Sequence, residues 1–335
     1  MTSAPTAAPP NAPILDALLP ILCCPRDQGA LSPEPAESRD VRSATLLRCA
    51  ICDAAYPVVR AIPRFVPTDD YAGNFSLEWT VHRKTQLDNE TSRISEDTFR
   101  IKTGLTPDEV RGKLVLDVGC GMGRFADVIV KWGGRVIGID LSLAVESAQS
   151  NLGGTGRFQA LQASVFGLPF KTESFDIIYS LGVLHHTPDC KKAFMALPPL
   201  LKRGGHIAIW VYSSHTFPDC GVDEIRDGFI RRFTTRMNSR ALHNLCRALC
   251  LIRPRWRAFW HMLLPGFVYH AIPRLHSYKS YDWRVLDTFD WYSPVYQSKH
   301  SYPEVCDWFR EAGLCDVRPL RFEVAVRGHK AAGGA

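Results

Sequence analysis

The sequence contains no apolar run as long as the roughly 18–20 residues that a helix needs to cross a bilayer. Residues 1–13 contain no lysine or arginine, and the short apolar run 14–24 lacks a small-residue cleavage site. A secretory signal needs both features, so we do not predict one. No internal repeat is present, so a repeat architecture is not expected. These absences predict a cytoplasmic protein whose residues 1–19 form a disordered tail.

A disulfide framework is also absent. The 11 cysteines are odd in number and scattered through 335 residues, which is typical of free thiols in a reducing compartment. The net charge of +6 is mild, so it permits contact with nucleic acid or an anionic surface without requiring it. The hydrophobic fraction of 46% can fill a core, and the length predicts about two domains.

Four segments follow the tail. Residues 20–67 form a cysteine- and proline-rich module, and residues 68–111 form a polar, aromatic linker. Strands and helices then alternate over 112–213, the pattern of a parallel sheet, and residues 303–328 complete this core. Residues 214–302 between the two core pieces are aromatic and basic. We expect an α/β protein with a doubly wound, mostly parallel sheet.

The expected elements of the core follow from apolar runs and their punctuation. Gly133 and Gly134 end one helix, and Ser142 can cap the next. The expected strands are 113–118, 135–140, 158–162, 175–180, 206–212, 315–320 and 321–326. The expected helices include 125–132, 144–151, 191–201 and 303–312.

A glycine-rich turn, LDVGCGMG at residues 116–123, follows the first of these strands and opens a helix. Glycines at such a turn let the backbone bend tightly and let a ligand approach closely. Asp140 ends the next strand, where a carboxylate can accept hydrogen bonds from both hydroxyls of a ribose. The turn and Asp140 together predict a nucleoside-containing cofactor.

A dinucleotide is the alternative occupant of this turn. Its pattern is G-x-G-x-x-G, but Arg124 stands where the third glycine would be. Asp117, two residues before the first glycine, would face a pyrophosphate unfavourably. That carboxylate suits a ligand with an ammonium group. S-adenosylmethionine carries an ammonium and a sulfonium and no phosphate, so we favour it.

Further motifs share one resemblance. Residues 115–124, 139–142 (IDLS), 168–170 (LPF) with 173–176 (ESFD), and 182–186 (GVLHH) resemble the class I methyltransferase superfamily. Their order and spacing are close to those of the ubiquinone and menaquinone C-methyltransferase group. The resemblance implies a seven-stranded sheet whose last strand is antiparallel, and S-adenosylmethionine as cofactor.

The resemblance also implies roles for single residues. Asp117, Gly119 and Gly121 would hold the amino acid end of the cofactor, and Asp140 the ribose. Relatives often carry Asp where Ser164 stands, facing the adenine amino group, and a hydroxyl can also accept that bond. The full expected cofactor set is Asp117, Gly119, Cys120, Gly121, Gly123, Asp140, Leu141, Ser164, Val165 and Leu181.

His185 and His186 are the candidate catalytic residues. They follow the fourth strand, at the carboxyl edge of the sheet where open α/β sheets bind ligands. Either could orient the cofactor or take a proton from the acceptor, whereas packing or helix capping is the alternative role. The segment lacks the Asn/Asp-Pro-Pro-aromatic signature of enzymes that methylate adenine or glutamine nitrogen, and no Pro-Cys motif of cytosine C5 methyltransferases is present.

The N-terminal module carries a candidate metal site. Cys49 and Cys52 form a C-x-x-C knuckle, and Cys24 with Asp27 is its upstream partner, with Asp27 where a zinc ribbon would have cysteine. Cys23 could replace Asp27, or the metal could be lost. The flanks 56–58 (YPV) and 62–67 (IPRFVP) resemble the small zinc-ribbon activators of RNA and protein methyltransferases. No βαβ unit surrounds Cys49 and Cys52, which disfavours a thioredoxin-like role.

Two segments could cover the site. In the linker, Trp79, Arg83 or Gln86 could fold over the cofactor, or could simply pack between domains. Residues 214–287 hold 12 Lys and Arg against 6 Asp and Glu, and 241–252 reads as an amphipathic helix. We interpret 214–302 as a helical substrate lid, with RNA stacking or peripheral membrane contact as alternatives. Its run 286–293, with Tyr296 and Gln297, could line a small-molecule pocket or only pack the lid.

Three functions follow from these motifs. The first is methyl transfer to a small or medium-sized organic acceptor at oxygen, carbon, nitrogen or sulfur. The second is an RNA-modifying methyltransferase that uses the ribbon and the basic lid for recognition. The third is a non-catalytic cofactor-binding scaffold, which is disfavoured because Asp117, the glycines and Asp140 are all present. No pattern indicates the oligomeric state.

Overall fold

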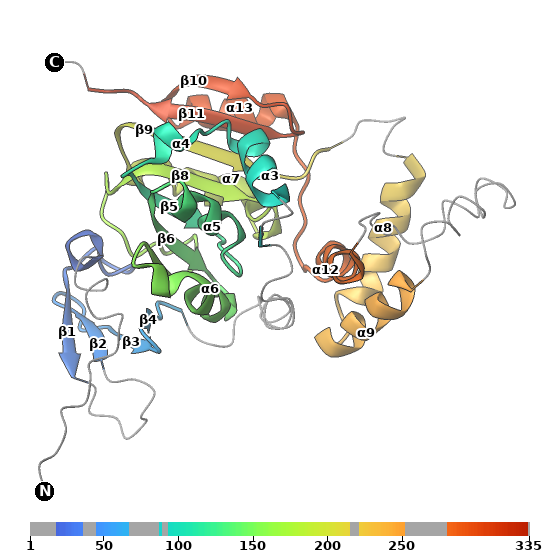
Figure 1. The fold of residues 1–335 in the computed structure, drawn as a ribbon, viewed down its shortest axis with the longest axis horizontal. Helices are drawn as coiled ribbons and strands as arrows, with labels where there is room; N and C mark the ends of the chain where they lie inside the picture. The colour runs from blue at the N-terminus through green and yellow to red at the C-terminus, as the bar shows by residue number, and fades with distance from the viewer. Residues whose placement is uncertain are drawn as a thin grey trace, which may run out of the picture.

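A seven-stranded sheet forms the centre of the computed structural model, which describes residues 18–35, 45–66, 87–88, 93–214, 221–251 and 280–333 (Figure 1). The strands are β5 (Leu114–Val118), β6 (Arg135–Asp140), β7 (Phe158–Gln162), β8 (Phe175–Leu181), β9 (Leu201–Trp210), β10 (Leu314–Pro319) and β11 (Ala325–Lys330). Their order is β10-β11-β9-β8-β5-β6-β7, and β11 is antiparallel to both of its neighbours. The predicted fold class and the antiparallel last strand are confirmed.

The sheet is parallel from β7 to β9, and the helices that connect these strands bury it on both faces. All five residues of β7 are buried, as expected for a strand covered on both sides. One face packs on α3 (Ile94–Thr103), α5 (Arg124–Lys131) and α6 (Ala144–Leu152), and α4 (Pro107–Val110) lies beside them. The other face packs on α7 (Cys190–Met195) and α13 (Tyr302–Glu311). Phe194 of α7 stacks on Phe309 of α13 there.

Three of the expected elements are wrong in their bounds. The helix expected over 191–201 is α7, which stops at Met195, because Pro198 and Pro199 cannot continue it and form a short 3₁₀ turn. The strand expected over 206–212 is β9, which already begins at Leu201 and ends at Trp210. The closing strand expected over 321–326 is β11, which begins only at Ala325.

The expected cap of the second core helix is also wrong. Leu143 occupies the N-cap position of α6, without a side-chain capping bond. The Ser142 hydroxyl does accept a hydrogen bond from Ala144 N (3.2 Å), but it donates to Asp140 (2.7 Å). Ser142 therefore links the start of α6 to the end of β6.

The N-terminal module is a second, antiparallel sheet of β1 (Leu31–Pro35), β2 (Thr45–Cys49), β3 (Ala55–Val59) and β4 (Ile62–Pro63). It lies against the β7 edge of the large sheet (Figure 1). Arg64 forms a bridge with Gln162 there, and Phe65 N donates to Gln162 O (2.8 Å). Covering β7 in this way satisfies backbone groups that an open sheet edge would expose.

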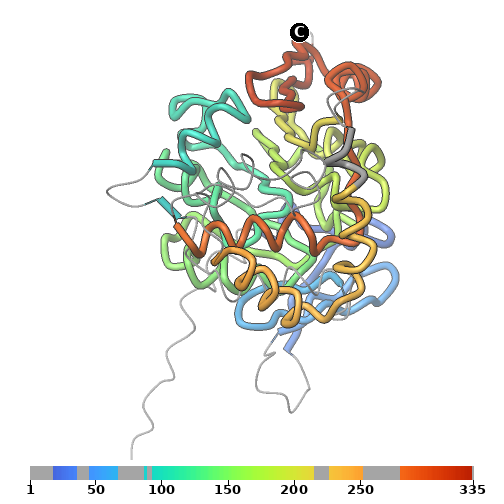
Figure 2. Tube along the Cα trace, turned by 90° about the vertical axis from the view of Figure 1, so that its right-hand side faces the viewer, coloured from blue at the N-terminus to red at the C-terminus, as the bar shows by residue number. Residues whose placement is uncertain are grey.

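Three helices form a separate layer over the carboxyl edge of the sheet: α8 (Gly221–Thr234), α9 (Ser239–Cys250) and α12 (Tyr281–Tyr292) (Figures 1 and 2). The helix expected over 241–252 is α9. Its apolar face packs on α12 through Leu242, Cys246, Cys250, Val285 and Phe289. We call α8, α9 and α12 the lid. Within the described ranges, no helix is long and apolar enough to span a membrane.

Some predictions lie outside the described residues. Trp79, Arg83 and Gln86 of the linker, the tail 1–17 and the lid segment 252–279 belong to this group.

Candidate active site

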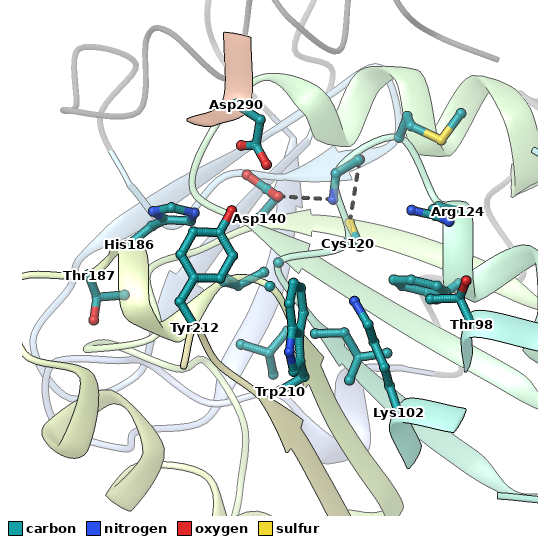
Figure 3. Close-up of a pocket in the computed structure, with 18 of the residues that line it drawn as sticks. Thr98, Lys102, Cys120, Arg124, Asp140, His186, Thr187, Trp210, Tyr212 and Asp290 are labelled. Carbon is teal, nitrogen blue, oxygen red and sulfur yellow. Dashed lines mark hydrogen bonds between the residues drawn. The ribbon is translucent and has the colours of Figure 1, made fainter. Parts of the chain in front are cut away.

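A cavity of about 550 Å³ opens at the carboxyl ends of β5, β6, β8 and β9, between the sheet and the lid (Figure 3). Its walls include the loops after these strands and after β7, the start of α5, helices α3 and α12, and the segment between β10 and β11. Ligands bind at this edge of an open α/β sheet, because the loops diverge there and leave a crevice. The cavity is thus in the predicted place.

The glycine-rich turn forms the floor of this cavity. Gly119 adopts a φ of 82°, and a Cβ at this residue would collide with the side chain of Val183. Gly119 N and Cys120 N both donate to Ile139 O, at 2.8 and 2.9 Å. The turn is therefore tied to the end of the neighbouring strand β6.

Asp140 is fixed by the same turn. Its Oδ2 accepts from Gly121 N (3.0 Å; Figure 3). Its Oδ1 accepts from Ser142 N (2.9 Å) and from Ser142 Oγ (2.7 Å). Burial raises the pKa of Asp140, and the hydrogen bonds from Ser142 and Gly121 act in the opposite direction. A carboxylate has about four acceptor positions, so Oδ2 retains one for a ligand hydroxyl.

Asp117 lies behind the turn rather than in the cavity wall. Its side chain is buried, and its Oδ2 has no hydrogen-bond partner among the described residues. Burial raises the pKa of Asp117 to about 7. The Tyr179 hydroxyl acts to lower this pKa, and the charge of Asp140 acts to raise it. A buried carboxylate oxygen without a partner is costly, and a cationic group would satisfy it. Its predicted contact with the ammonium group stays a prediction.

The structure brings most of the predicted cofactor residues to the cavity wall. Gly123 is an exception besides Asp117: it adopts a φ of 92° at the N-cap of α5, and a Cβ there would press on Leu152. Gly123 thus serves the packing of α5 on α6. The predicted residues that line the cavity are Gly119, Cys120, Gly121, Asp140, Leu141, Ser164, Val165 and Leu181.

His186 and His185 have different surroundings. His186 lines the cavity, and its Nδ1 lies 3.0 Å from the carbonyl oxygen of Tyr296 (Figure 3). His185 is fully buried, stacks on the Tyr212 ring at 3.8 Å, and is not part of the cavity wall. Burial lowers the pKa of His186 to about 4 and that of His185 well below its usual range. Of the two predicted histidines, only His186 can reach a bound ligand.

Lys102 of α3 is a cavity residue that we did not predict. It is buried, and its Nζ lies 3.1 Å from the centroid of the Trp210 ring. Burial lowers the pKa of Lys102 well below its usual range, the nearby charge of Arg124 also lowers it, and Asp287 opposes both. Lys102 follows the buried residues Ser95 and Phe99 at helical spacing, so helical periodicity indicates a buried position but not that this position faces a cavity.

The lid contributes acidic and aromatic side chains. From the expected run 286–293, Asp287, Asp290 and Trp291 line the cavity, whereas Tyr296 and Gln297 do not. Burial raises the pKa of Asp290 to about 7, Asp287 adds to this, and Arg231 opposes it.

Trp291 connects the lid to the sheet. Its ring stacks on Tyr212 at 5.3 Å, and Tyr212 in turn stacks on His185. The Trp291 indole donates to Asp227 of α8 (3.0 Å). Arg231 of α8 donates to the carbonyl oxygens of Trp291 (2.7 Å) and Pro294 (2.6 Å). The C-terminal end of α12 is therefore held by Tyr212 and by α8.

The predicted metal residues come together in the N-terminal module. Ligand atoms of Cys24, Asp27, Cys49 and Cys52 all lie within 4.8 Å of one another. Cys23 does not join them, because its thiol donates to Gln28 Oε1 (3.1 Å). The cluster has the residue types and spacing of a four-ligand site.

Comparison with known proteins agrees with this site. Residues 116–209 match the family model described as a methyltransferase domain. The ubiquinone biosynthesis O-methyltransferase of Paracidovorax citrulli (strain AAC00-1) is 38% identical over 140 residues, which are 40% of this chain and 56% of that protein. The tRNA U34 carboxymethyltransferase of Pseudomonas aeruginosa (strain LESB58) is 36% identical over 105 residues, which are 30% of this chain and 33% of that protein.

The chain spans about half the length of the ubiquinone biosynthesis O-methyltransferases that it matches. Among solved structures, the complex between the Haloferax volcanii Trm112 methyltransferase activator and a methyltransferase gives a TM-score of 0.44 at 14% identity, covering 79% of this chain and 100% of that chain. The family match and the relatives confirm the resemblance of residues 116–209 to class I S-adenosylmethionine-dependent methyltransferases.

Proposed function

We propose that this chain, which contains a methyltransferase domain, transfers the methyl group of S-adenosylmethionine to a small or medium-sized organic acceptor held under the lid. One observation carries the proposal. The glycine-rich turn, Asp140 and His186 open into a single cavity that α12 closes from the other side. Cofactor and acceptor can therefore lie side by side in one cavity, as in-line transfer requires.

The cavity residues divide between the two ligands. Gly119, Gly121 and Asp140 lie on the side where the cofactor would bind, and Asp117 stands directly behind them. Arg124 is a cation in the same wall and suits the carboxylate of the cofactor, and the side chain of Lys102 lines the same wall. The bound cofactor supplies an electrophilic methyl group on a sulfonium with a good leaving group. The protein then has mainly to align the reactants and exclude water.

His186 is the candidate proton acceptor. The carbonyl oxygen of Tyr296 can only accept, so Nδ1 of His186 carries the hydrogen of that bond and Nε2 holds the lone pair of the neutral ring. The lowered pKa keeps this ring neutral at pH 7. When the acceptor is a hydroxyl or an amine, this nitrogen would take up the proton that the acceptor loses on methylation.

Labelled methyl transfer to a fractionated cell extract tests the proposal. Label in the small-molecule or lipid fraction, lost with Asp140→Ala, is the expected result. Cofactor binding without turnover on any fraction would instead favour the non-catalytic scaffold. Normal cofactor binding by Asp140→Ala would overturn the site assignment.

RNA is the second candidate acceptor, because the outer surface of the lid is basic and aromatic. Arg232, Arg236, Arg240 and Arg247 are exposed on α8, on α9 and in the turn between them, and the Phe229 and Phe233 rings are exposed on α8. One relative is a tRNA-modifying enzyme. Such a surface would give RNA binding that weakens steeply with salt. Ribonuclease-sensitive label in the extract experiment would promote this candidate over the first.

We also propose that Cys24, Asp27, Cys49 and Cys52 bind zinc. Three thiolates and a carboxylate match the ligand preferences of this ion, and the antiparallel sheet around them is ribbon-like. Elemental analysis of the purified protein should give about one zinc per chain, since one cluster serves one ion. Cys49→Ser should lose the metal, whereas Cys23→Ser should retain it. Equal zinc content in both variants would contradict the assignment.

The cytoplasmic location stays a proposal supported by cysteine chemistry. Ten of the eleven cysteines lie in described residues, and all ten are free thiols. Free thiols, three of them grouped with Asp27 as candidate metal ligands, fit a reducing compartment.

A further inference from the structure

The loop that follows β6 is held in place by a side chain of β7, which is in turn held by the N-terminal module. This loop, residues 140–142, contains the candidate ribose ligand Asp140 and the cavity residue Leu141. The Leu141 carbonyl accepts a hydrogen bond from Gln162 Nε2 (2.8 Å). Gln162 is the last residue of β7 and is 1% exposed. The position of the loop therefore depends on how the Gln162 amide is oriented.

Arg64, from the N-terminal module, sets that orientation. Its Nη1 donates to Gln162 Oε1 (3.0 Å), and its Nη2 donates to Glu146 Oε1 of α6 (2.8 Å). A guanidinium can only donate and the Leu141 carbonyl can only accept, so the amide oxygen must face Arg64 and the amide nitrogen must face Leu141. Without Arg64, the Gln162 amide could rotate about its last side-chain bond. A rotated amide would no longer donate to the Leu141 carbonyl.

The Arg64 side chain is buried where it contacts Gln162 and Glu146. Its side chain is 6% exposed, and burial lowers the pKa of Arg64, against the attraction of Glu146. A buried guanidinium is costly unless its donors are satisfied, so the pairing geometry is tightly constrained. Arg60 offers a contrast within the same module. It pairs with the other oxygen of Glu146 (2.7 Å) but is 63% exposed.

We propose that Arg64 is a positioning residue for the cofactor site. Through Gln162 it fixes the carbonyl of Leu141, and so it sets where the Asp140 carboxylate stands to receive the ribose hydroxyls. The N-terminal module thus contributes to cofactor affinity without touching the cofactor. This inference rests on the proposed binding of S-adenosylmethionine.

Calorimetric titration of the full chain with S-adenosylhomocysteine tests it. Arg64→Met keeps the length of the aliphatic stem but removes all five donors. We expect binding about tenfold weaker, because the fixed orientation of one buried charge-assisted bond is worth about that factor. The control is Arg60→Met, which loses a pair with the same Glu146 and should bind within about twofold of wild type, since exposed pairs contribute little.

A second variant isolates the link through Gln162. In Gln162→Glu the carboxylate still accepts from Arg64 but can no longer donate to the Leu141 carbonyl. It should weaken binding as Arg64→Met does, even though the partner of Arg64 is retained. This variant keeps the test decisive if Arg64→Met fails to fold, which thermal unfolding without ligand would show.

A ligand change separates positioning from a general loss of structure. The 2′-deoxyribose analogue of S-adenosylhomocysteine lacks one hydroxyl for Asp140. Wild type should bind this analogue more weakly than the parent ligand, and Arg64→Met should show a smaller difference between the two. If Arg64→Met binds the parent ligand like Arg60→Met, or loses the same factor for both ligands, the positioning role is refuted. If wild type binds neither ligand, the cofactor assignment itself fails, and this inference falls with it.

Discussion

The two sides of the cavity are built differently. On the cofactor side, the wall consists of backbone and short side chains from consecutive strand ends, such as Gly119, Gly121 and Asp140. Hydrogen bonds of 2.7–3.0 Å tie these groups to one another. On the acceptor side, His186, Tyr212, Asp290 and Trp291 come from three separate parts of the chain, and their rings and helices pack to hold them.

This difference separates cofactor binding from turnover and acceptor binding. The cofactor side depends on strand register, which is fixed by the sheet and can be altered little without loss of the fold. The acceptor side depends on how α12 lies on the sheet, and Arg231 and Asp227 of α8 hold that arrangement. Changes in the first side should therefore act on cofactor binding, and changes in the second on turnover and acceptor affinity.

The largest expected effect is the loss of Asp140. Asp140→Ala removes a carboxylate that both holds Gly121 and faces the ribose. Two hydrogen bonds to a charged group contribute about 3–6 kcal/mol, so cofactor affinity should fall by roughly 10²–10⁴-fold. Calorimetry with S-adenosylmethionine measures this, with circular dichroism as the check on folding. A loss of turnover at unchanged cofactor affinity would contradict the proposed division of the cavity into a cofactor side and an acceptor side.

His186→Phe should act on the other side. It keeps an aromatic ring but removes the proton acceptor, so turnover should fall by about 10²–10⁴-fold while cofactor affinity is unchanged. His185→Phe, at the buried position, is the matched control and should retain most of the turnover. An equal effect of the two substitutions would show that packing, not proton transfer, explains the pair.

The pH dependence sharpens the role of His186. Its pKa is lowered to about 4, and only the neutral ring can accept a proton. Turnover should therefore rise as the pH increases through about 4 and gain nothing from this group above that value. A limb near the ordinary histidine pKa of about 6.5 would contradict the proposed base.

Trp291→Phe tests the lid. It preserves an aromatic ring next to Tyr212 but loses the indole bond to Asp227. A weaker stack and one lost hydrogen bond amount to about 1–2 kcal/mol, so kcat/KM for the acceptor should fall roughly fivefold to thirtyfold. Cofactor affinity should not change. Phe229→Ala, on the exposed face of α8, is the control for effects on the lid as a whole.

The smallest effect is expected at Ser164. Its hydroxyl lines the cavity but already accepts a hydrogen bond from Phe166 N (3.2 Å), which holds the local turn. A second bond to the adenine would be weak, so Ser164→Ala should reduce cofactor affinity by about threefold or less. A loss above tenfold would mean that this side chain matters for adenine recognition as much as Asp140 does for the ribose.

The strand-end motifs were predictable because their geometry is local. The residues of the turn follow β5, and Asp140 ends β6, so parallel pairing places them together without further information. The metal cluster was predictable for a similar reason, since Cys49 and Cys52 share a knuckle and Cys24 with Asp27 forms a second one. Proline spacing was overlooked: Pro198 and Pro199 should have ended the expected helix before Leu201.

Other site residues could not be assigned from local pattern alone. Lys102 lies on an amphipathic helix, and nothing in its sequence neighbours indicates that the helix faces a ligand cavity. Asp290 and Trp291 stand beyond a long segment, and their contact with Tyr212 depends on the packing of α12. The difference between His185 and His186 also required the fold, because adjacent residues of a short turn point in different directions.

The sequence by itself determined the fold class, the cofactor turn and the identity of the candidate metal ligands, because these depend on hydrophobic period, glycine position and short spacing. Only the tertiary structure decided which histidine reaches the cavity, which lid side chains face it, and that Arg64 of the N-terminal module holds Gln162 beside the cofactor loop. Those relations join residues that are far apart in the sequence; Arg64 and Gln162, for example, are 98 positions apart. Their contacts arise from packing between layers, which no local pattern encodes.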